Sequence, residues 1–154
     1  YKLAAKQGNS DAPHNLGVMY RNGNGVPQNR QTALKWYRLS AKQGNPHSAF
    51  ALGLMHSKGD GIPQDYEKAV KWFRLASGWG HIPSQFNLGK FYYFGDGVQK
   101  DYVRAHMWWD IVVRSGDKAG VKIRDIVAKK MTPSQLGKSK KLARECVAKE
   151  YKGC

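Results

Sequence analysis

With 154 residues, of which 41% are apolar, the chain is long enough for one domain with a packed core. No apolar run approaches the roughly 18 residues of a membrane-spanning helix, and residues 1–6 lack the apolar core of a signal peptide, so we expect a soluble chain whose export signal, if any, lies outside this sequence. The formal net charge of +15 leaves nucleic acid, anionic lipid and acidic polysaccharide open as partners.

A unit of 36 residues recurs three times along the chain. A leucine followed by a glycine stands at 16–17, 52–53 and 88–89. Four more positions recur at the same spacing, namely Gly25/Gly61/Gly97, Ala33/Ala69/Ala105, Trp36/Trp72/Trp108 and Gly44/Gly80/Gly116. Periods of 20 to 50 residues are typical of solenoid proteins, so five positions in register over three copies predict a stack of helical repeats.

The chain begins inside a repeat. Residues 2–9 match residues 38–45 at the same offset of 36. We therefore interpret residues 1–11 as a half repeat, the second helix of a preceding unit. A stacked repeat normally has a capping unit at each end, so this half repeat suggests a piece of a longer array, with an open end at which another copy could pair.

The first complete unit, residues 12–47, predicts two antiparallel helices. Its segments 12–22 and 31–43 place apolar or small residues at helical spacing, and a glycine-rich loop separates them. Gly17 is expected to let a neighbouring backbone approach, because it has no Cβ. Asn29 is predicted to cap the second helix. The adjacent aromatics Trp36 and Tyr37 are both expected to fill the space between repeats.

The next two units, residues 48–83 and 84–117, repeat this pattern with departures. Each has an aspartate at the place of Asn29, which suits the same capping role. His56 stands where the other two units have tyrosine, and His106 stands where they have leucine or valine. These departures should change only local packing.

Residues 118–154 predict capping helices that close the stack. Residues 119–130 form one amphipathic helix, and Thr132, Pro133 and Gln135 make the capping box of a second. The apolar stripe of the second helix is expected at Leu136, Ala143 and Val147. From residue 118 onward, eleven Lys and Arg stand against three Asp and Glu, about half of the excess charge. These cations fit either a solvent-exposed surface or a patch that docks an anionic partner.

Cys146 and Cys154 are the only cysteines. Eight residues of continuous helix would separate their Cα atoms by about 12 Å, whereas a disulfide tolerates about 7 Å. A disulfide therefore requires the helix to end before Gly153. Both a disulfide, which would indicate an oxidising compartment, and two free thiols remain open.

The repeat resembles the Sel-like repeat (SLR) family, relatives of the tetratricopeptide proteins. The matching text, A-x-x-x-L-G-x-x-Y…G-x-G-V-P-Q…A-x-x-W-Y-x-x-x-A-x-Q-G, runs from Ala12 to Gly44 and recurs twice with drift. The tail from Met131 to Cys146 resembles the C-terminal ending of many exported bacterial members. The resemblance implies an all-α fold, a right-handed superhelix (α-solenoid) of antiparallel helix pairs, whose first helices line a concave surface used to bind proteins or to serve bacterial envelope and polysaccharide systems.

No constellation of residues points to catalysis or to a metal. None of the five histidines has the i, i+4 spacing with a glutamate that marks a zinc protease. Asp60, Asp65 and Glu67 gather around one loop, but equivalent positions in the other units favour turn and capping roles. The Gly-x-Gly loops follow helices instead of strands, which argues against a phosphate cradle. We therefore expect no enzyme, no cofactor and no metal site.

By analogy with tetratricopeptide grooves, a concave partner-binding surface is expected on the first helix of each unit. Its residues would be Asp11, His14, Val18 and Arg21; His47, Phe50, Leu54 and Ser57; and Pro83, Phe86, Lys90 and Tyr93. The alternative is that Phe50 and Phe86 pack between repeats. Adjacent helical residues point about 100° apart, so the aromatic run at 91–94 cannot bury every ring and should leave aromatic surface for a ligand.

The leading functional prediction is a non-enzymatic scaffold that binds a peptide or protein partner in this groove, in the periplasm or after secretion. The alternative is an anionic polymer, either envelope polysaccharide or nucleic acid, bound by the basic C-terminal cap. Salt separates the two predictions, because polyanion binding weakens steeply as salt rises.

Overall fold

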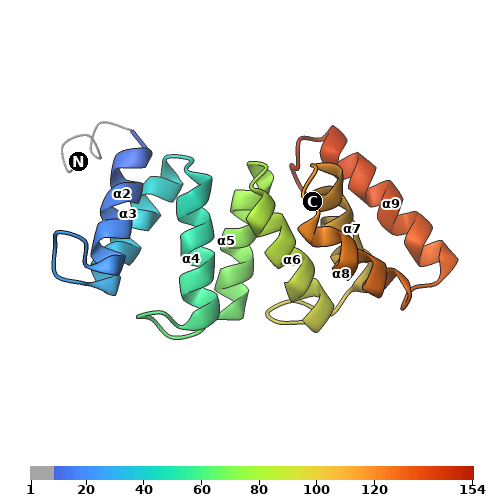
Figure 1. Cartoon of the computed structure of the whole chain (residues 1–154), viewed down its shortest axis with the longest axis horizontal. Helices are drawn as coiled ribbons and strands as arrows, with labels where there is room; N and C mark the ends of the chain where they lie inside the picture. The colour runs from blue at the N-terminus through green and yellow to red at the C-terminus, as the bar shows by residue number, and fades with distance from the viewer. Residues whose placement is uncertain (1–8) are drawn as a thin grey trace. The chain divides into compact units, whose positions relative to one another are not determined.

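The computed structural model describes residues 9–154, and every regular element among them is an α-helix (Figure 1). The helices are α2 (Asp11–Asn22), α3 (Arg30–Lys42), α4 (Pro46–Lys58), α5 (Tyr66–Gly78), α6 (Ile82–Phe94), α7 (Tyr102–Arg114), α8 (Ala119–Ala128) and α9 (Pro133–Ala148). The all-helical repeat fold is confirmed, whereas the handedness of its superhelix stays a prediction. The half repeat predicted for residues 1–11 falls mostly outside the described residues.

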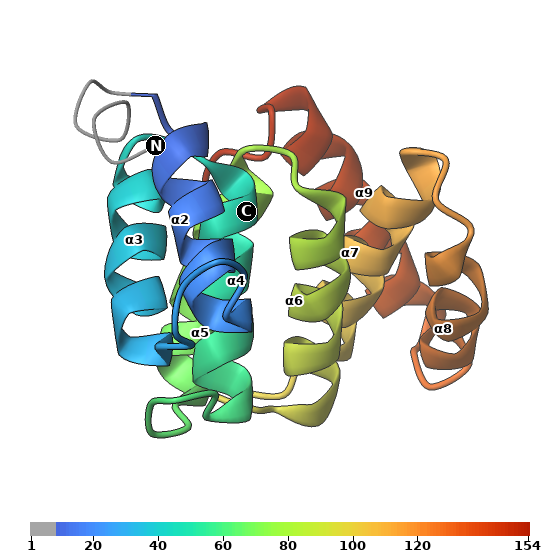
Figure 2. The ribbon, with the colours of Figure 1, turned by 60° about the vertical axis from the view of Figure 1, so that its left-hand side comes forward.

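The chain divides into two compact units, residues 1–76 and 77–154. Within unit 1, α2 packs on α3 and α3 packs on α4, an arrangement that Figure 2 shows from a second side. Unit 2 is built around α7, because α6, α8 and α9 each pack on that helix. None of the helices between residues 9 and 154 combines the length and the apolar character needed to cross a membrane.

The three repeats share one loop, in which a glycine ends the first helix and an Asn or Asp begins the second. The glycines are Gly23, Gly59 and Gly95, with φ of 76°, 69° and 84° in the left-handed region that favours glycine. The caps are Asn29, Asp65 and Asp101, whose side chains accept hydrogen bonds of 2.9, 2.9 and 3.0 Å from the N–H three residues on. The predicted capping roles are therefore confirmed.

In each helix pair, a glycine of the first helix packs against an aromatic ring of the second. A Cβ at Gly17 would lie 2.6 Å from Cδ1 of Tyr37, and one at Gly53 would lie 2.6 Å from Cε1 of Phe73. Gly89 makes the same close approach to Trp109. The expectation that Gly17 accommodates a neighbouring backbone is wrong, because a side-chain ring of the second helix takes that space.

Helix α3, the second helix of the first repeat, carries two adjacent aromatic residues, and only one of them is fully buried. Tyr37 is 2% exposed, while Trp36 is partly buried and packs against Ala12 and Leu16. In unit 2 the corresponding residues Trp108 and Trp109 are both buried. The prediction that both rings fill the space between repeats is met by Tyr37, which belongs to one core cluster with Ala49 and Leu52 of α4, but not by Trp36, which packs on α2 of its own repeat.

Two further helices, α8 and α9, complete unit 2. Thr132 and Gln135 form the capping box at the start of α9, with both hydrogen bonds present. The predicted apolar stripe is partly wrong, because Val147 is exposed and the buried side of α9 consists of Ser139, Ala143 and Cys146. The reason is that α9 packs on α7, where the hydroxyl of Ser139 bonds Nδ1 of His106 at 2.8 Å.

Cys146 and Cys154 form a disulfide. Helix α9 ends at Ala148, and positive φ at Glu150, Tyr151 and Gly153 turns the chain back. The Cα atoms are 5.6 Å apart, so the helix ends early enough for the bond, as the spacing required.

Candidate protein-interaction surfaces

The first-helix residues predicted to bind a partner fall into both units, and none of them is buried. In unit 1 they are Asp11, His14, Val18 and Arg21 on α2, and His47, Phe50, Leu54 and Ser57 on α4. In unit 2 they are Pro83, Phe86, Lys90 and Tyr93 on α6. Because they recur every three or four residues, the members of each set share one side of their helix.

His14 anchors a polar chain in unit 1. Its Nδ1 lies 2.8 Å from the hydroxyl of Ser48, which donates to the hydroxyl of Ser40 at 2.8 Å; Ser40 in turn donates to the carbonyl of Ser10 at 2.6 Å. The rings of His14 and His47 are 6.1 Å apart. Burial and the neighbouring His47 lower the pKa of His14, so its ring is neutral at neutral pH.

Arg21 contacts the next repeat. Its Nε donates to the carboxylate of Asp60 at 3.2 Å, and Arg30 pairs with the other oxygen of that carboxylate. Asp60 belongs to the loop between α4 and α5, so the two arginines of the first repeat hold the loop of the second. Arg21 therefore stabilises the contact between two repeats, and the part of its side chain that stays exposed can still meet a partner.

Phe50 and Phe86 stand at one position of successive repeats, and both pack on a ring of their own repeat. The ring of Phe50 lies 5.8 Å from that of Phe73, and the ring of Phe86 lies 6.4 Å from that of Trp109. Both phenylalanines remain partly exposed. These two ring contacts lie within one repeat, so the alternative that both phenylalanines pack between repeats stays a prediction. A partner can contact only the surface of the two rings that remains exposed.

In unit 2, aromatic rings and lysines gather at the C-terminal end of α6. Tyr93 lies 5.0 Å from Phe94, 5.4 Å from Tyr102 and 5.9 Å from Trp109, measured between ring centroids. Phe94 meets Tyr93 edge-on and is 63% exposed. The aromatic surface predicted for residues 91–94 therefore includes Phe94.

Three lysines lie over these rings. The Nζ of Lys90 is 5.3 Å from the ring of Phe86, that of Lys100 is 5.2 Å from the ring of Tyr102, and that of Lys130 is 5.0 Å from the ring of Tyr93. Such distances allow cation–π attraction. We call this set the aromatic–lysine surface; it consists of Phe86, Lys90, Tyr93, Phe94, Lys100, Tyr102 and Lys130.

Lys130 and Tyr102 were not among the residues predicted from the sequence. The Nζ of Lys130 donates to the hydroxyl of Tyr93 at 2.6 Å, and this hydrogen bond raises the pKa of Lys130. The two residues are 37 positions apart, and Lys130 follows α8 outside the repeat pattern. Periodicity alone gives no signal for such a pair, because only the packing of α8 on α7 brings Lys130 to α6.

The acidic loop residues have partners that explain them. Asp60 pairs with two arginines, and Asp65 caps α5 while pairing with Lys68 at 2.8 Å. The hydrogen bonds from Lys68 lower the pKa of Asp65. Among residues 9–154 no three His, Cys, Asp or Glu side chains gather closely enough to hold a metal ion.

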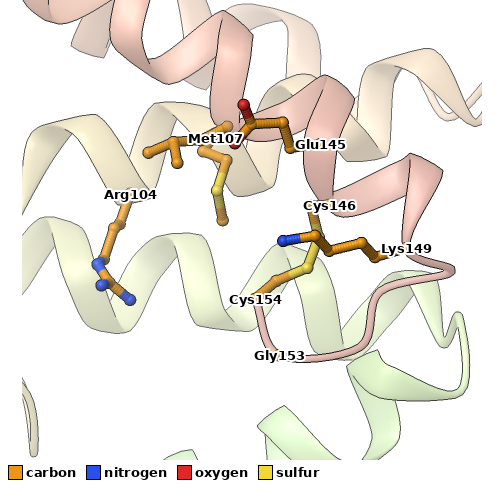
Figure 3. A pocket seen from close by; sticks show the side chains of 8 residues that line it. Arg104, Met107, Glu145, Cys146, Lys149, Gly153 and Cys154 are labelled. Atoms are coloured by element: carbon orange, nitrogen blue, oxygen red, sulfur yellow. A yellow bond between two sulfur atoms is a disulfide. The ribbon is translucent and has the colours of Figure 1, made fainter.

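A small cavity of about 140 Å³ lies beside the disulfide in unit 2 (Figure 3). Arg104 and Met107 of α7, Glu145 and Lys149 near the end of α9, and the disulfide itself line it. Its volume is below that of a typical ligand pocket, so we assign no ligand to it.

Comparison with known proteins agrees with the repeat that the structure shows. The model of the Sel1 repeat matches residues 10–45, 46–77 and 82–111. A Sel1 repeat protein from Oxalobacter formigenes superposes with a TM-score of 0.75 at 32% identity, over 80% of this chain and 93% of that one.

A second similar structure is c5321, a protective antigen of uropathogenic Escherichia coli strains that displays an SLR fold. It superposes with a TM-score of 0.66 at 30% identity, over 98% of this chain. The match spans only 40% of the antigen, which is therefore much the longer chain. A search of curated proteins finds no match.

Proposed function

Because the chain belongs to the Sel1 repeat family, whose members generally act as non-catalytic scaffolds for protein–protein interaction, we propose that it binds a peptide or protein partner, with the aromatic–lysine surface of unit 2 as the principal contact. The first-helix face of unit 1 is the second proposed contact. The proposal includes no enzymatic step.

The observation that carries this proposal is the exposed ring of Phe94 beside Tyr93 and Lys130. Aromatic residues are enriched at the centres of protein interfaces, and an exposed ring beside further rings and lysines fits such a centre. The surrounding lysines favour carboxylates through charge complementarity. The expected partner segment therefore has an apolar anchor flanked by Asp or Glu.

Photocrosslinking from position 94 tests the proposal in the full chain. A photoreactive phenylalanine at 94 should capture a partner from a native envelope extract, and Phe94→Ala should weaken binding of that partner about tenfold or more, as expected for an interface anchor. Since Phe94 is largely exposed, its removal should leave the melting temperature unchanged.

Ile126 provides the matched control. It is also in unit 2 and is 44% exposed, but it lies on α8 outside the aromatic–lysine surface. A photoreactive residue at 126 should capture no partner, and Ile126→Ala should bind normally. Equal binding by the Phe94→Ala and Ile126→Ala variants would contradict the proposal.

Binding of an anionic polymer is the second candidate, and the exposed cations of α9 favour it. These are Lys138, Lys140, Lys141 and Arg144. Polymer binding releases counterions and should therefore fall steeply between low and high salt, with a slope that decreases when these residues are replaced. Partner binding at Phe94 includes lysine–carboxylate contacts and should also weaken as salt rises, but less steeply, because the apolar anchor releases no counterions.

We place the protein in the periplasm or outside the cell. The disulfide between Cys146 and Cys154 supports this location, because such bonds persist in oxidising compartments and are rare in the cytosol. Mass measurement of the protein taken from its native source should show the loss of two hydrogens that the bond requires. A fully reduced mass would argue for a reducing compartment.

A further inference from the structure

Two adjoining open cavities in unit 1 stand apart from the surfaces described above. Their volumes are about 490 and 380 Å³, and Arg38, His56 and Lys68 line both. Lys71, Trp72 and Leu75 complete the larger one. These residues come from α3, α4 and α5, and the larger volume lies in the range of small-molecule pockets.

His56 is buried beside these cavities without a hydrogen-bond partner. It is 5% exposed, and neither Nδ1 nor Nε2 of its ring finds a partner among the described residues. Buried polar groups are almost always hydrogen-bonded, so an orphaned imidazole that lines a cavity is a candidate ligand contact. Burial first, and then the charges of Arg38 and Lys68, lower the pKa of His56; the ring is thus neutral at neutral pH and has one N–H to donate.

The charge around the larger cavity has one sign. Arg38, Lys68 and Lys71 line it together with His56, and no acidic side chain does. Lys68 pairs with Asp65, which lines only the smaller cavity, whereas Arg38 and Lys71 form no ion pair with any described residue. A site with two uncompensated cations attracts an anion.

The remaining wall is apolar. Trp72 is partly buried, and Leu75 is 40% exposed although it is a large aliphatic side chain. An inorganic anion has no apolar surface to bury against this wall, so the wall would add nothing to its binding free energy. A ligand with an apolar body would cover it and gain from removing its surface from water.

We propose that this cavity binds a small organic acid, a carboxylate carried on an aromatic or aliphatic body. The carboxylate pairs with Arg38 and Lys71 beside the ring of His56, and the body lies against Trp72 and Leu75. The site belongs to unit 1 and uses none of the residues of the aromatic–lysine surface, so it is independent of the proposed protein contact.

Phenylacetate is the probe, and nuclear magnetic resonance on the whole chain is the readout. Additions up to about 10 mM should shift the ring signals of His56 and the indole signal of Trp72, because so small a ligand is expected to bind in the millimolar range. A bound carboxylate also favours the charged imidazole, so the pKa of His56 should rise. Phenylacetamide lacks the charge and acetate lacks the body, and both should bind about tenfold more weakly or worse.

Two variants on α3 separate a specific site from general charge. Arg38→Ala and Lys35→Ala each remove one cation from the same helix, but Lys35 does not line the cavity. Arg38→Ala should weaken phenylacetate binding about tenfold or more, while Lys35→Ala should change it less than about twofold. Equal losses in both variants, or no shift at His56 and Trp72 in the wild type, overturn the proposal.

His56→Tyr tests the buried contact without endangering the fold, because tyrosine occupies this position in the other two repeats. The variant should lose phenylacetate binding.

A peptide ending in phenylalanine, with a free carboxylate or an amide at its C-terminus, distinguishes a free small acid from the C-terminal carboxylate of a protein partner. Tighter binding of the free-carboxylate peptide than of phenylacetate would assign the cavity to a partner's C-terminus and overturn the small-acid proposal. Phe94→Ala must leave phenylacetate binding unchanged.

Discussion

His56 of the second repeat and Tyr92 of the third occupy the same helical position, but one carries an imidazole and the other a larger phenol ring. Both are buried, and both carbonyls accept a 2.8 Å hydrogen bond from the N–H of the cap residue, Asp65 or Asp101. The hydroxyl of Tyr92 accepts a hydrogen bond of 3.4 Å from Arg104, whereas the ring nitrogens of His56 have no hydrogen-bond partner among residues 9–154. The repeat backbone therefore tolerates a local exchange that converts a satisfied core position into a candidate binding site.

The second and third repeats share a glycine–ring contact, and disturbing this contact should lower stability more than exchanging the residues at 56 and 92. Gly53→Ala and Gly89→Ala each place a Cβ against a buried ring, so each should lower the free energy of unfolding by about 1–3 kcal/mol, as overpacking does. Urea denaturation measures this loss. The control is Gly137→Ala on α9, where nothing lies within 4 Å of the added Cβ and a gain of about 0.5–1 kcal/mol is expected. Similar stabilities for the Gly53→Ala and Gly137→Ala variants would show that the glycine–ring contact does not hold the helix pair.

Exchanging histidine and tyrosine at positions 56 and 92 should have a smaller effect on stability. His56→Tyr removes a buried ring without hydrogen bonds, and the adjoining cavity gives the larger side chain room, so stability should rise by about 1 kcal/mol. The reverse exchange, Tyr92→His, should lower stability because the contact with Arg104 is lost. The shift of the urea midpoint measures both. A destabilised His56→Tyr variant would mean that the second repeat has adapted its packing to histidine.

The smallest effect expected is a pH dependence of stability. Burial lowers the pKa of His14, His56 and His106 below the ordinary value of 6.5 in the folded chain. As pH falls through about 6.5 the unfolded chain binds protons that the folded chain does not, so stability is greatest above this pH and declines below it. His56→Tyr should make the decline shallower. Identical pH profiles for wild type and variant, measured by thermal unfolding, would contradict a neutral buried His56.

The regular parts of the fold could be predicted because they depend on local sequence. The helix starts at Asn29 and Thr132 follow from capping chemistry that involves only the next three residues. The early end of α9 was predicted only as the condition for a disulfide between Cys146 and Cys154, from the reach of a helix. Each of these features needs no knowledge of distant segments.

The candidate sites could be predicted only in part. His14, Phe86 and Tyr93 were identified from their place in the repeat, and all three keep exposed surface. Lys130 was missed because its contact with Tyr93 depends on how α8 packs on α7. The sequence shows that His56 departs from the repeat, but it contains no sign that the ring is left without a partner beside a cavity.

The sequence by itself determined the period of 36 residues, the helix pairs, their caps and the family, because these depend on short-range chemistry repeated in register. Only the tertiary structure decided that Tyr37 is fully buried while its neighbour Trp36 is not, that a ring and not a backbone meets Gly17, and that Arg38, His56 and Lys71 surround one cavity. The physical reason is that burial and charge proximity are properties of packed neighbours from different helices, and a repeat pattern specifies the helices without specifying the side chains that meet between them.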